Sequence, residues 1–172
     1  MPHRRLGLVL AVLVFAFDQA SKHAVIDAAG FGGGAPLALG PWLDFVLVWN
    51  PGISYSLFSA QSVAGWLALL GVTIAVAAGL MVWLWRWPHS RAGAAALGCL
   101  IGGALGNAFD RAVYGKVADF IHIHFGAFAP FGVFNFADMA IFAGVALLLY
   151  DGLFPASAPA PGGGGEAASK LP

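Results

Sequence analysis

The stretch VAGWLALLGVTIAVAAGLMVWLW, residues 63–85, decides the fold because no charged side chain interrupts it. A bilayer core about 30 Å thick needs roughly 20 helical residues to cross it. Three more apolar segments are long enough: residues 6–28, 92–114 and 134–154. The sequence therefore predicts an all-α integral membrane protein with four transmembrane helices, in agreement with 60% apolar and only 9% charged residues.

The N-terminus also resembles a secretory signal peptide, with a basic end followed by an apolar run. We expect it to stay as the first helix, because the run continues into DQASK at 18–22 and three further spans follow. Lys and Arg favour the cytoplasmic side of a membrane. Arg4, Arg5, Arg86 and Arg91 flank the predicted helices, whereas residues 29–62 contain neither Lys nor Arg. This predicts cytoplasmic N- and C-termini. Arg111 and Lys116 fall on the outer side, which points to a functional role.

The chain composition excludes several classes of protein. Eight basic and eight acidic residues leave no net charge, so we expect no nucleic-acid partner. The single cysteine, Cys99, rules out an internal disulfide, and its apolar surroundings indicate a buried side chain.

The segments outside the helices differ in character. WLDFVLVW at 42–49 is typical of a strand, NPG at 50–52 of a turn, and ISYSLF at 53–58 of a second strand. We therefore expect a small outer β-element, about 42–58, between the first two helices. Residues 115–133 carry phenylalanines throughout, which predicts a connection lying on the membrane surface. Residues 1–154 would form the membrane domain and the Gly/Pro-rich residues 155–172 a disordered cytoplasmic tail.

Polar side chains recur at helical spacing in this apolar chain, where ionisable groups usually mark function. They lie on the first helix, on the third helix and just beyond it, and at the start of the fourth: Asp18, Lys22, Asn107, Asp110, Arg111, Asp119, Asn135 and Asp138. The helix directions place all of them near the outer ends. Purely structural interpretations are simpler for some of these residues: Asp18 and Lys22 could form an ion pair, and Asp110 could fix the end of the third helix. Gly98, Gly102 and Gly106 form a small-residue face that permits close helix packing.

Chemistry by a pair of aspartates fits this residue set best. We find no serine triad, and Cys99 has no neighbouring histidine. His122 and His124 are two apart on an extended segment without further ligands, and no HExxH is present, so we expect no metal and no cofactor. Two aspartates sharing a proton can act as acid and base and cleave a peptide bond.

Two other classes of protein stay open from the residues alone. A proton-linked permease uses membrane aspartates, although its polar groups would be distributed through the bilayer depth. A non-enzymatic assembly subunit would use the glycine face of the third helix for pairing, and would leave the repeated Asn-x-x-Asp spacing unexplained.

Five stretches together resemble bacterial lipoprotein signal peptidase, also called signal peptidase II: DQASK (18–22), NPGISYSLF (50–58), GGALGNAFDR (102–111), VADF (117–120) and FNFAD (134–138). The resemblance implies a four-helix aspartic endopeptidase of the bacterial inner membrane. It would remove the signal peptide before a diacylglyceryl-modified cysteine of a prolipoprotein, near the periplasmic face, as a monomer in contact with lipid.

The resemblance also implies roles for individual residues. Asp119 and Asp138 would be catalytic. The other matched positions would support the site or bind substrate: Asp18, Lys22, Asn50, Gly52, Gly103, Asn107, Asp110, Arg111, Asn135 and Ala137.

Overall fold

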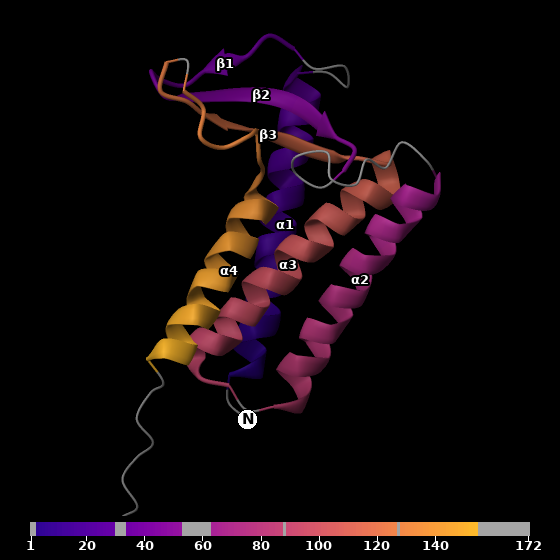
Figure 1. The fold of residues 1–172 in the computed structure, drawn as a ribbon, viewed down its shortest axis with the longest axis vertical. Helices are drawn as coiled ribbons and strands as arrows, with labels where there is room; N and C mark the ends of the chain where they lie inside the picture. Colours follow the sequence, from indigo (N-terminus) through magenta and orange to yellow (C-terminus); the bar gives the residue numbers. More distant parts are fainter. Residues whose placement is uncertain (1–2, 30–33, 53–62, 88, 127, 155–172) are drawn as a thin grey trace, which may run out of the picture.

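The computed structural model describes residues 3–29, 34–52, 63–87, 89–126 and 128–154. Four helices carry a small sheet at one end of the bundle (Figure 1). In chain order the elements are α1 (Arg4–Ala29), β1 (Leu37–Ala38), β2 (Leu43–Asn50), α2 (Val63–Arg86), α3 (Arg91–Tyr114), β3 (Val117–Ile123) and α4 (Phe136–Leu153). Each of these 4 helices is long and apolar enough to cross a membrane, which confirms the predicted class.

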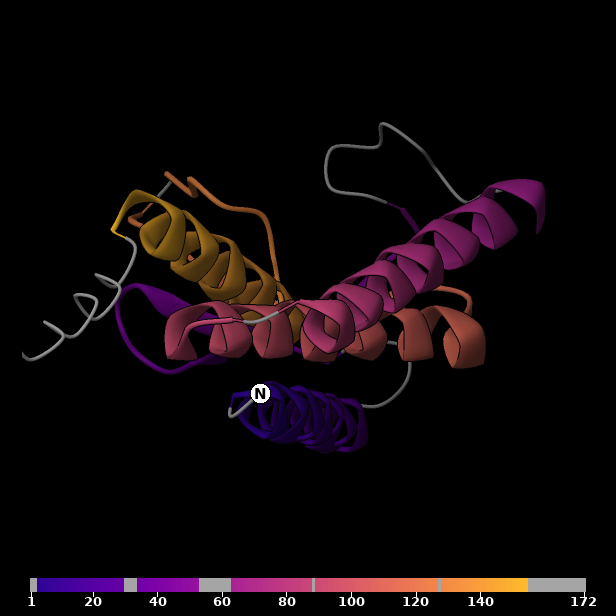
Figure 2. The same ribbon diagram turned by 90° about the horizontal axis from the view of Figure 1, so that it is seen from below.

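Helix α3 is the centre of the bundle and packs against the other three helices. Figure 2 shows α1 on one side of α3, with α2 and α4 on the other side and diverging from each other. The contact with α1 depends on small residues. A Cβ atom at Gly98 would lie 2.5 Å from the carbonyl oxygen of Gly7, and one at Gly102 would lie 2.6 Å from that of Ala11. The predicted packing role of these glycines agrees with this contact.

The sheet is antiparallel in the order β1-β2-β3. Strand β2 confirms the strand predicted at 42–49, and β1 precedes the predicted β-element at 42–58. The second strand expected at 53–58 lies outside the described residues, as does the predicted tail at 155–172. The register pairs Asp44 with His122 and Val48 with Asp119, with an irregularity between Phe45 and Val48.

Strand β3 corrects the prediction for residues 115–133. We expected an aromatic connection on the membrane surface, but residues 117–121 are buried between the helix ends and β2. Phe120 is 1% exposed and packs edge-on against Phe45 and Phe136. Because both faces of this segment are covered, it lacks the polar alternation by which a half-buried strand is predicted. Phe125, Phe128 and Phe131 are exposed, as expected.

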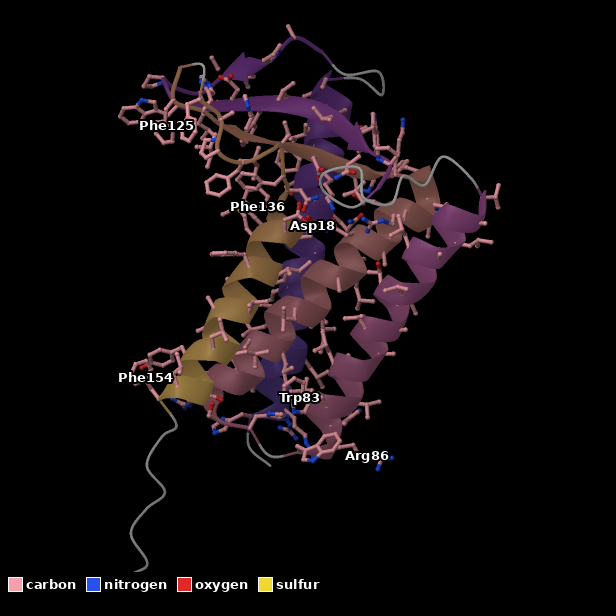
Figure 3. All side chains as sticks on the ribbon, viewed as in Figure 1. Asp18, Trp83, Arg86, Phe125, Phe136 and Phe154 are labelled. Carbon is pink, nitrogen blue, oxygen red and sulfur yellow. The ribbon has the colours of Figure 1, made fainter. Side chains whose placement is uncertain are left out.

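The end of the bundle opposite the sheet carries most of the arginines. The Arg4 guanidinium lies 5.4 Å from the centre of the Trp85 ring, and Arg86 and Arg91 flank the short link between α2 and α3. Ser90 caps α3 and donates to Asp151 near the end of α4 at 2.5 Å. Figure 3 shows Arg86 and Trp83 at this end, and Asp18 far from them, beneath the sheet.

Candidate active site

A buried ionic cluster joins α1 to α3 beneath the sheet. The Lys22 ammonium lies 2.8 Å from a carboxylate oxygen of Asp18 and 2.8 Å from one of Asp110. All three residues are at most 1% exposed. A buried charge is tolerated where it is paired and hydrogen-bonded, and this lysine is paired twice. The predicted pair of Asp18 and Lys22 is present, and Asp110 extends it to a second helix.

Backbone and amide donors satisfy the remaining oxygens of this cluster. Asp18 Oδ1 accepts from the Ala137 N–H at 2.9 Å, and Asp110 Oδ2 accepts from the Ala118 N–H at 3.2 Å. The Gln19 amide donates to Asp18 at 3.1 Å and to Asp110 at 3.0 Å. The sequence reasoning did not single out Gln19, although it lies inside the DQASK stretch. The cluster thereby fixes the start of β3 on α3 and the start of α4 on α1.

Asn135 connects Asp119 to Asp138. Its side-chain amide donates to Asp119 Oδ1 at 2.6 Å, and its backbone N–H donates to Asp138 Oδ2 at 3.2 Å. Its side-chain oxygen accepts from the Asp138 N–H at 3.0 Å. The last two contacts form a capping box at the start of α4. The residue that begins this helix therefore also holds both carboxylates.

Asn107 links the ionic cluster to the two aspartates. Its Oδ1 accepts from Lys22 Nζ at 3.0 Å and from Asn135 at 3.2 Å. Its amide donates to Asp138 Oδ1 at 2.9 Å. One oxygen of Asp138 is thus held from α3 and the other from its own helix start.

Asp119 is placed by β3 and held from both sides. Besides Asn135, the Asn50 side chain on β2 donates to its Oδ2 at 3.0 Å. The residue is 3% exposed. The pKa of Asp119 is raised to about 7. Burial contributes most to the rise and the negative charge of Asp138 adds to it, while the hydrogen bonds from Asn50 and Asn135 act against it. This carboxyl is therefore protonated much more readily than an exposed aspartate.

Arg111 holds the turn that follows β2. Its guanidinium donates to the Gly52 carbonyl at 3.4 Å and to the Asn107 carbonyl at 3.2 Å. The Gly52 N–H in turn donates to Asn50 Oδ1 at 3.0 Å. Trp66 on α2 donates to the Arg111 carbonyl at 2.7 Å. Arg111, an exception to the charge bias used to predict the topology, thus connects the turn after β2 to α3.

Gly103 and Ala137 form a close contact between α3 and α4. A Cβ atom at Gly103 would lie 2.5 Å from the Ala137 carbonyl oxygen, which is backbone and cannot move aside easily. Ala137 is fully buried. These two residues position α4 rather than offer polar groups. The structure thus brings all twelve predicted site residues into one region: Asp18, Lys22, Asn50, Gly52, Gly103, Asn107, Asp110, Arg111, Asp119, Asn135, Ala137 and Asp138.

His122 and His124 lie apart from this network. Both face Asp44 of β2: His124 Nε2 is 3.1 Å and His122 Nδ1 is 4.0 Å from Asp44 Oδ2. The sequence prediction of no metal depended on the lack of a further ligand near these histidines, and Asp44 is such a ligand.

This chain is similar to several known proteins in sequence and in fold. A sequence model described as signal peptidase (SPase) II matches residues 10–154. Proteins named lipoprotein signal peptidase from Methylocella silvestris and Beijerinckia indica are 53% and 47% identical, over 99% and 94% of this chain and 100% and 96% of their own lengths. Two solved structures described as bacterial membrane enzymes are both 27% identical, with TM-scores of 0.74 and 0.72. They cover 86% and 88% of this chain, and 87% and 94% of their own.

Proposed function

This chain belongs to the signal peptidase II family of aspartic endopeptidases, and from that premise we propose that Asp119 and Asp138 are its catalytic pair. The observation that carries the proposal is the double contact of Asn135, which binds one oxygen of each carboxylate. In the described part of the chain, these carboxylates accept hydrogen bonds from neutral amides rather than from a directly paired cation. One proton can therefore be exchanged between them and a substrate.

The surroundings of the two carboxylates support different roles in the reaction. Asp138 lies in the first turn of α4, and its Oδ1 accepts a hydrogen bond from the Asn107 amide. It is only partly buried, so water can reach it. Asp119 is buried and readily protonated, with its pKa raised to about 7. Asp138 is the base that takes a proton from water, and Asp119 is the acid that hydrogen-bonds the scissile carbonyl.

The reaction then proceeds without metal or cofactor. The activated water adds to the carbonyl carbon while Asp119 protonates the carbonyl oxygen, which gives a tetrahedral diol. Asp138, now protonated, delivers its proton to the amide nitrogen, and the C–N bond breaks. Asp119 recovers a proton from the collapsing diol as the new carboxyl group forms. Asn135 and Asn107 hold the two aspartates in place through both proton transfers.

The substrate we propose is a prolipoprotein whose cysteine already carries diacylglycerol, cut just before that cysteine. The relatives from Methylocella silvestris and Beijerinckia indica are named lipoprotein signal peptidase. In this chain the aspartates lie where four apolar helices meet the sheet. A substrate held by two acyl chains would present its peptide bond at that depth, with the signal peptide against the sheet.

The distribution of charge supports an orientation in the bacterial inner membrane. The arginines at 4, 86 and 91 gather at the end opposite the aspartates, which favours cytoplasmic termini and a periplasmic site. A Cys99→Ala protein carrying either Gly40→Cys or His89→Cys tests this. An impermeant thiol reagent added to intact spheroplasts should label position 40 and not position 89. The reverse pattern would contradict the proposed orientation.

The decisive experiment is cleavage of a diacylglyceryl-modified prolipoprotein by the purified full chain in detergent–lipid micelles. Asp119→Asn and Asp138→Asn should each reduce turnover by roughly 10²–10⁴-fold, with unchanged helix content. The unlipidated precursor should not be cut. Near-normal turnover by either variant would refute the catalytic pair. A folded wild-type protein that never cleaves would favour the permease or assembly-subunit alternative. Turnover per protein that is constant on dilution supports a monomer.

A further inference from the structure

Three potential metal ligands meet on the outer part of the sheet. Asp44 on β2 is paired in register with His122 on β3, and His124 follows two positions later. Side chains on a strand alternate between faces with a period of two, and cross-strand partners share a face. The ligand atoms of all three lie within 4.8 Å of one another. The pairing of the strands therefore creates a cluster that neither strand has alone.

A hydrogen bond does not account well for this cluster. His124 Nε2 is enclosed by protein and has no aligned hydrogen-bond partner among the described residues, although Asp44 Oδ2 is 3.1 Å away. The His122 and His124 rings are stacked, with centres 5.2 Å apart and planes 21° apart. A buried polar atom without a partner is costly. A cation bound between this nitrogen and the carboxylate would satisfy both atoms.

We propose that Asp44, His122 and His124 bind a first-row divalent transition-metal ion, of which Zn²⁺ is the test case. Two imidazoles and one carboxylate suit zinc and its neighbours, whereas Mg²⁺ and Ca²⁺ prefer oxygen ligands. Ligands about 2.0–2.2 Å from a metal lie roughly 3–3.5 Å apart. The 3.1 Å separation already fits, and the 4.0 Å separation of His122 from Asp44 needs a small side-chain rotation.

The site is reachable by an ion and leaves room for water. The side chains are 29%, 22% and 21% exposed for His122, Asp44 and His124. Three protein ligands leave a fourth position of a tetrahedral ion to solvent. The bound metal would tie β2 to β3, the strands that also carry Asn50 and Asp119. His122 is three residues from Asp119, so the pleat places the metal and the catalytic carboxylate on opposite faces.

The test is a Zn²⁺ titration of the full chain in micelles by calorimetry, after removal of any affinity tag and treatment with chelator. The wild type should bind one equivalent. The double variant His122→Gln/His124→Gln should bind Zn²⁺ more than roughly 100-fold more weakly, because loss of a residue that only supports a metal ligand already costs roughly 10–100-fold. Asp44→Asn alone should weaken binding by a similar factor. Co²⁺ should give the strong visible absorption of a four-coordinate site in the wild type only. Excess Mg²⁺ should not compete.

Two controls locate the ion. The chain keeps His3, His23 and His89 in the double variant, so binding that survives there belongs to those residues or to lipid and overturns the proposal. Asp119→Asn should bind Zn²⁺ as the wild type does. If Asp119→Asn loses the ion and the double histidine variant retains it, the metal lies at the catalytic carboxylates and the proposal is wrong. No turnover enters this measurement, so it stands or falls apart from the proposed peptidase reaction.

Discussion

Two pairs of aspartates lie at the same end of the bundle, and they differ in what lies between them. Asp18 and Asp110 share the Lys22 ammonium, which is 2.8 Å from each. Asp119 and Asp138 share Asn135, whose amide groups carry no net charge. The first pair is bridged by a basic side chain at salt-bridge distance from both carboxylates. The second pair is bridged by a neutral amide, which suits the acid–base roles proposed for it.

The two pairs are alike in residue type and similar in burial, so their different partners are what supports the different roles proposed for them. Asp18, Asp110 and Asp119 are all at most 3% exposed. A salt bridge at the catalytic pair would fix one protonation state. If an amide replaced Lys22, the buried Asp18 and Asp110 would have no counter-charge, at a cost of several kcal/mol. Asn107 contacts Lys22 of the first group and Asp138 of the second, and so fixes the position of one group relative to the other.

The largest expected effect comes from removing the cation of the first pair. Lys22→Met leaves two carboxylates facing each other without a charge partner, which should destabilise the protein by about 3–5 kcal/mol. Thermal unfolding in micelles, followed by circular dichroism, measures this. Lys116→Met is the matched control, because that ammonium lies 4.6 Å from the centre of the partly buried Trp49 ring rather than in the ionic cluster. A contact of this kind is worth about 0.5–1 kcal/mol. Equal losses in both variants would remove the distinction between the pairs.

The second effect separates holding the catalytic pair from capping a helix. Asn135→Ala removes the amide shared by Asp119 and Asp138, and hydrogen bonds to charged groups are worth about 1.5–3 kcal/mol. Turnover should fall about 10–100-fold, with roughly 1 kcal/mol of stability lost with the cap of α4. Ser90→Ala removes the cap of α3 at the opposite end. It should cost similar stability and leave turnover intact, and a similar fall in turnover there would refute the special role of Asn135.

The third prediction concerns pH. The pKa of Asp119 in the fold, about 7, exceeds its ordinary 3.8, so folding favours the protonated form. Its contribution to stability is complete below pH 3.8 and is lost as pH rises through about 7. The kcat/KM value should decline above about pH 7, where the acid is lost. The melting temperature of the wild type should fall more between about pH 6 and about pH 8.5 than that of Asp119→Asn. Parallel curves would show that Asp119 does not titrate there.

The smallest effect tunes that same titration. The Asn50 hydrogen bond lowers the pKa of Asp119, so Asn50→Ala should move the alkaline limb of the kcat/KM profile upward by less than about 1 pH unit. Val48→Ala serves as the control, since Val48 is the direct cross-strand partner of Asp119 and offers no side-chain donor. If the alkaline limb of Asn50→Ala moves to lower pH, or moves by the same amount in Val48→Ala, the Asn50 hydrogen bond does not lower the pKa of Asp119.

The sequence predicted the helices well and the sheet less well, for a physical reason. A membrane span is predicted from a continuous apolar run such as residues 63–85. It can be recognised without knowing which distant residues pack against it. Strand β3 is covered on both faces by groups from distant segments, which removes the alternation that marks a strand. Its partner β2 comes before two intervening helices, so the pairing of Asp44 with His122 could not be foreseen from either stretch.

The same limit applies within the site. Motif resemblance identified the polar residues, and helical spacing predicted the pair of Asp18 with Lys22. Neither predicted that Asp110 joins this pair or that Asn135 contacts both Asp119 and Asp138. These contacts depend on where α1, α3 and α4 bring Lys22 and Asn135. Gln19 was missed because a single glutamine on a helix carries no local signal. Its role comes from the approach of α3, where Asp110 and the Gly106 carbonyl accept from the Gln19 amide at 3.0 Å and 3.2 Å.

The contact of the Ala137 N–H with Asp18 has a consequence for the order of events during synthesis. Asp18 is made near the beginning of the chain, and one of its oxygens receives its donor only when the start of α4 has been translated. Asn135 and Asp138 emerge at the same time. A nascent chain halted before residue 135 would carry α1, α3 and Asp119 but no second carboxylate and no clamp. Insertion of the last helix is therefore the step that completes the proposed catalytic pair.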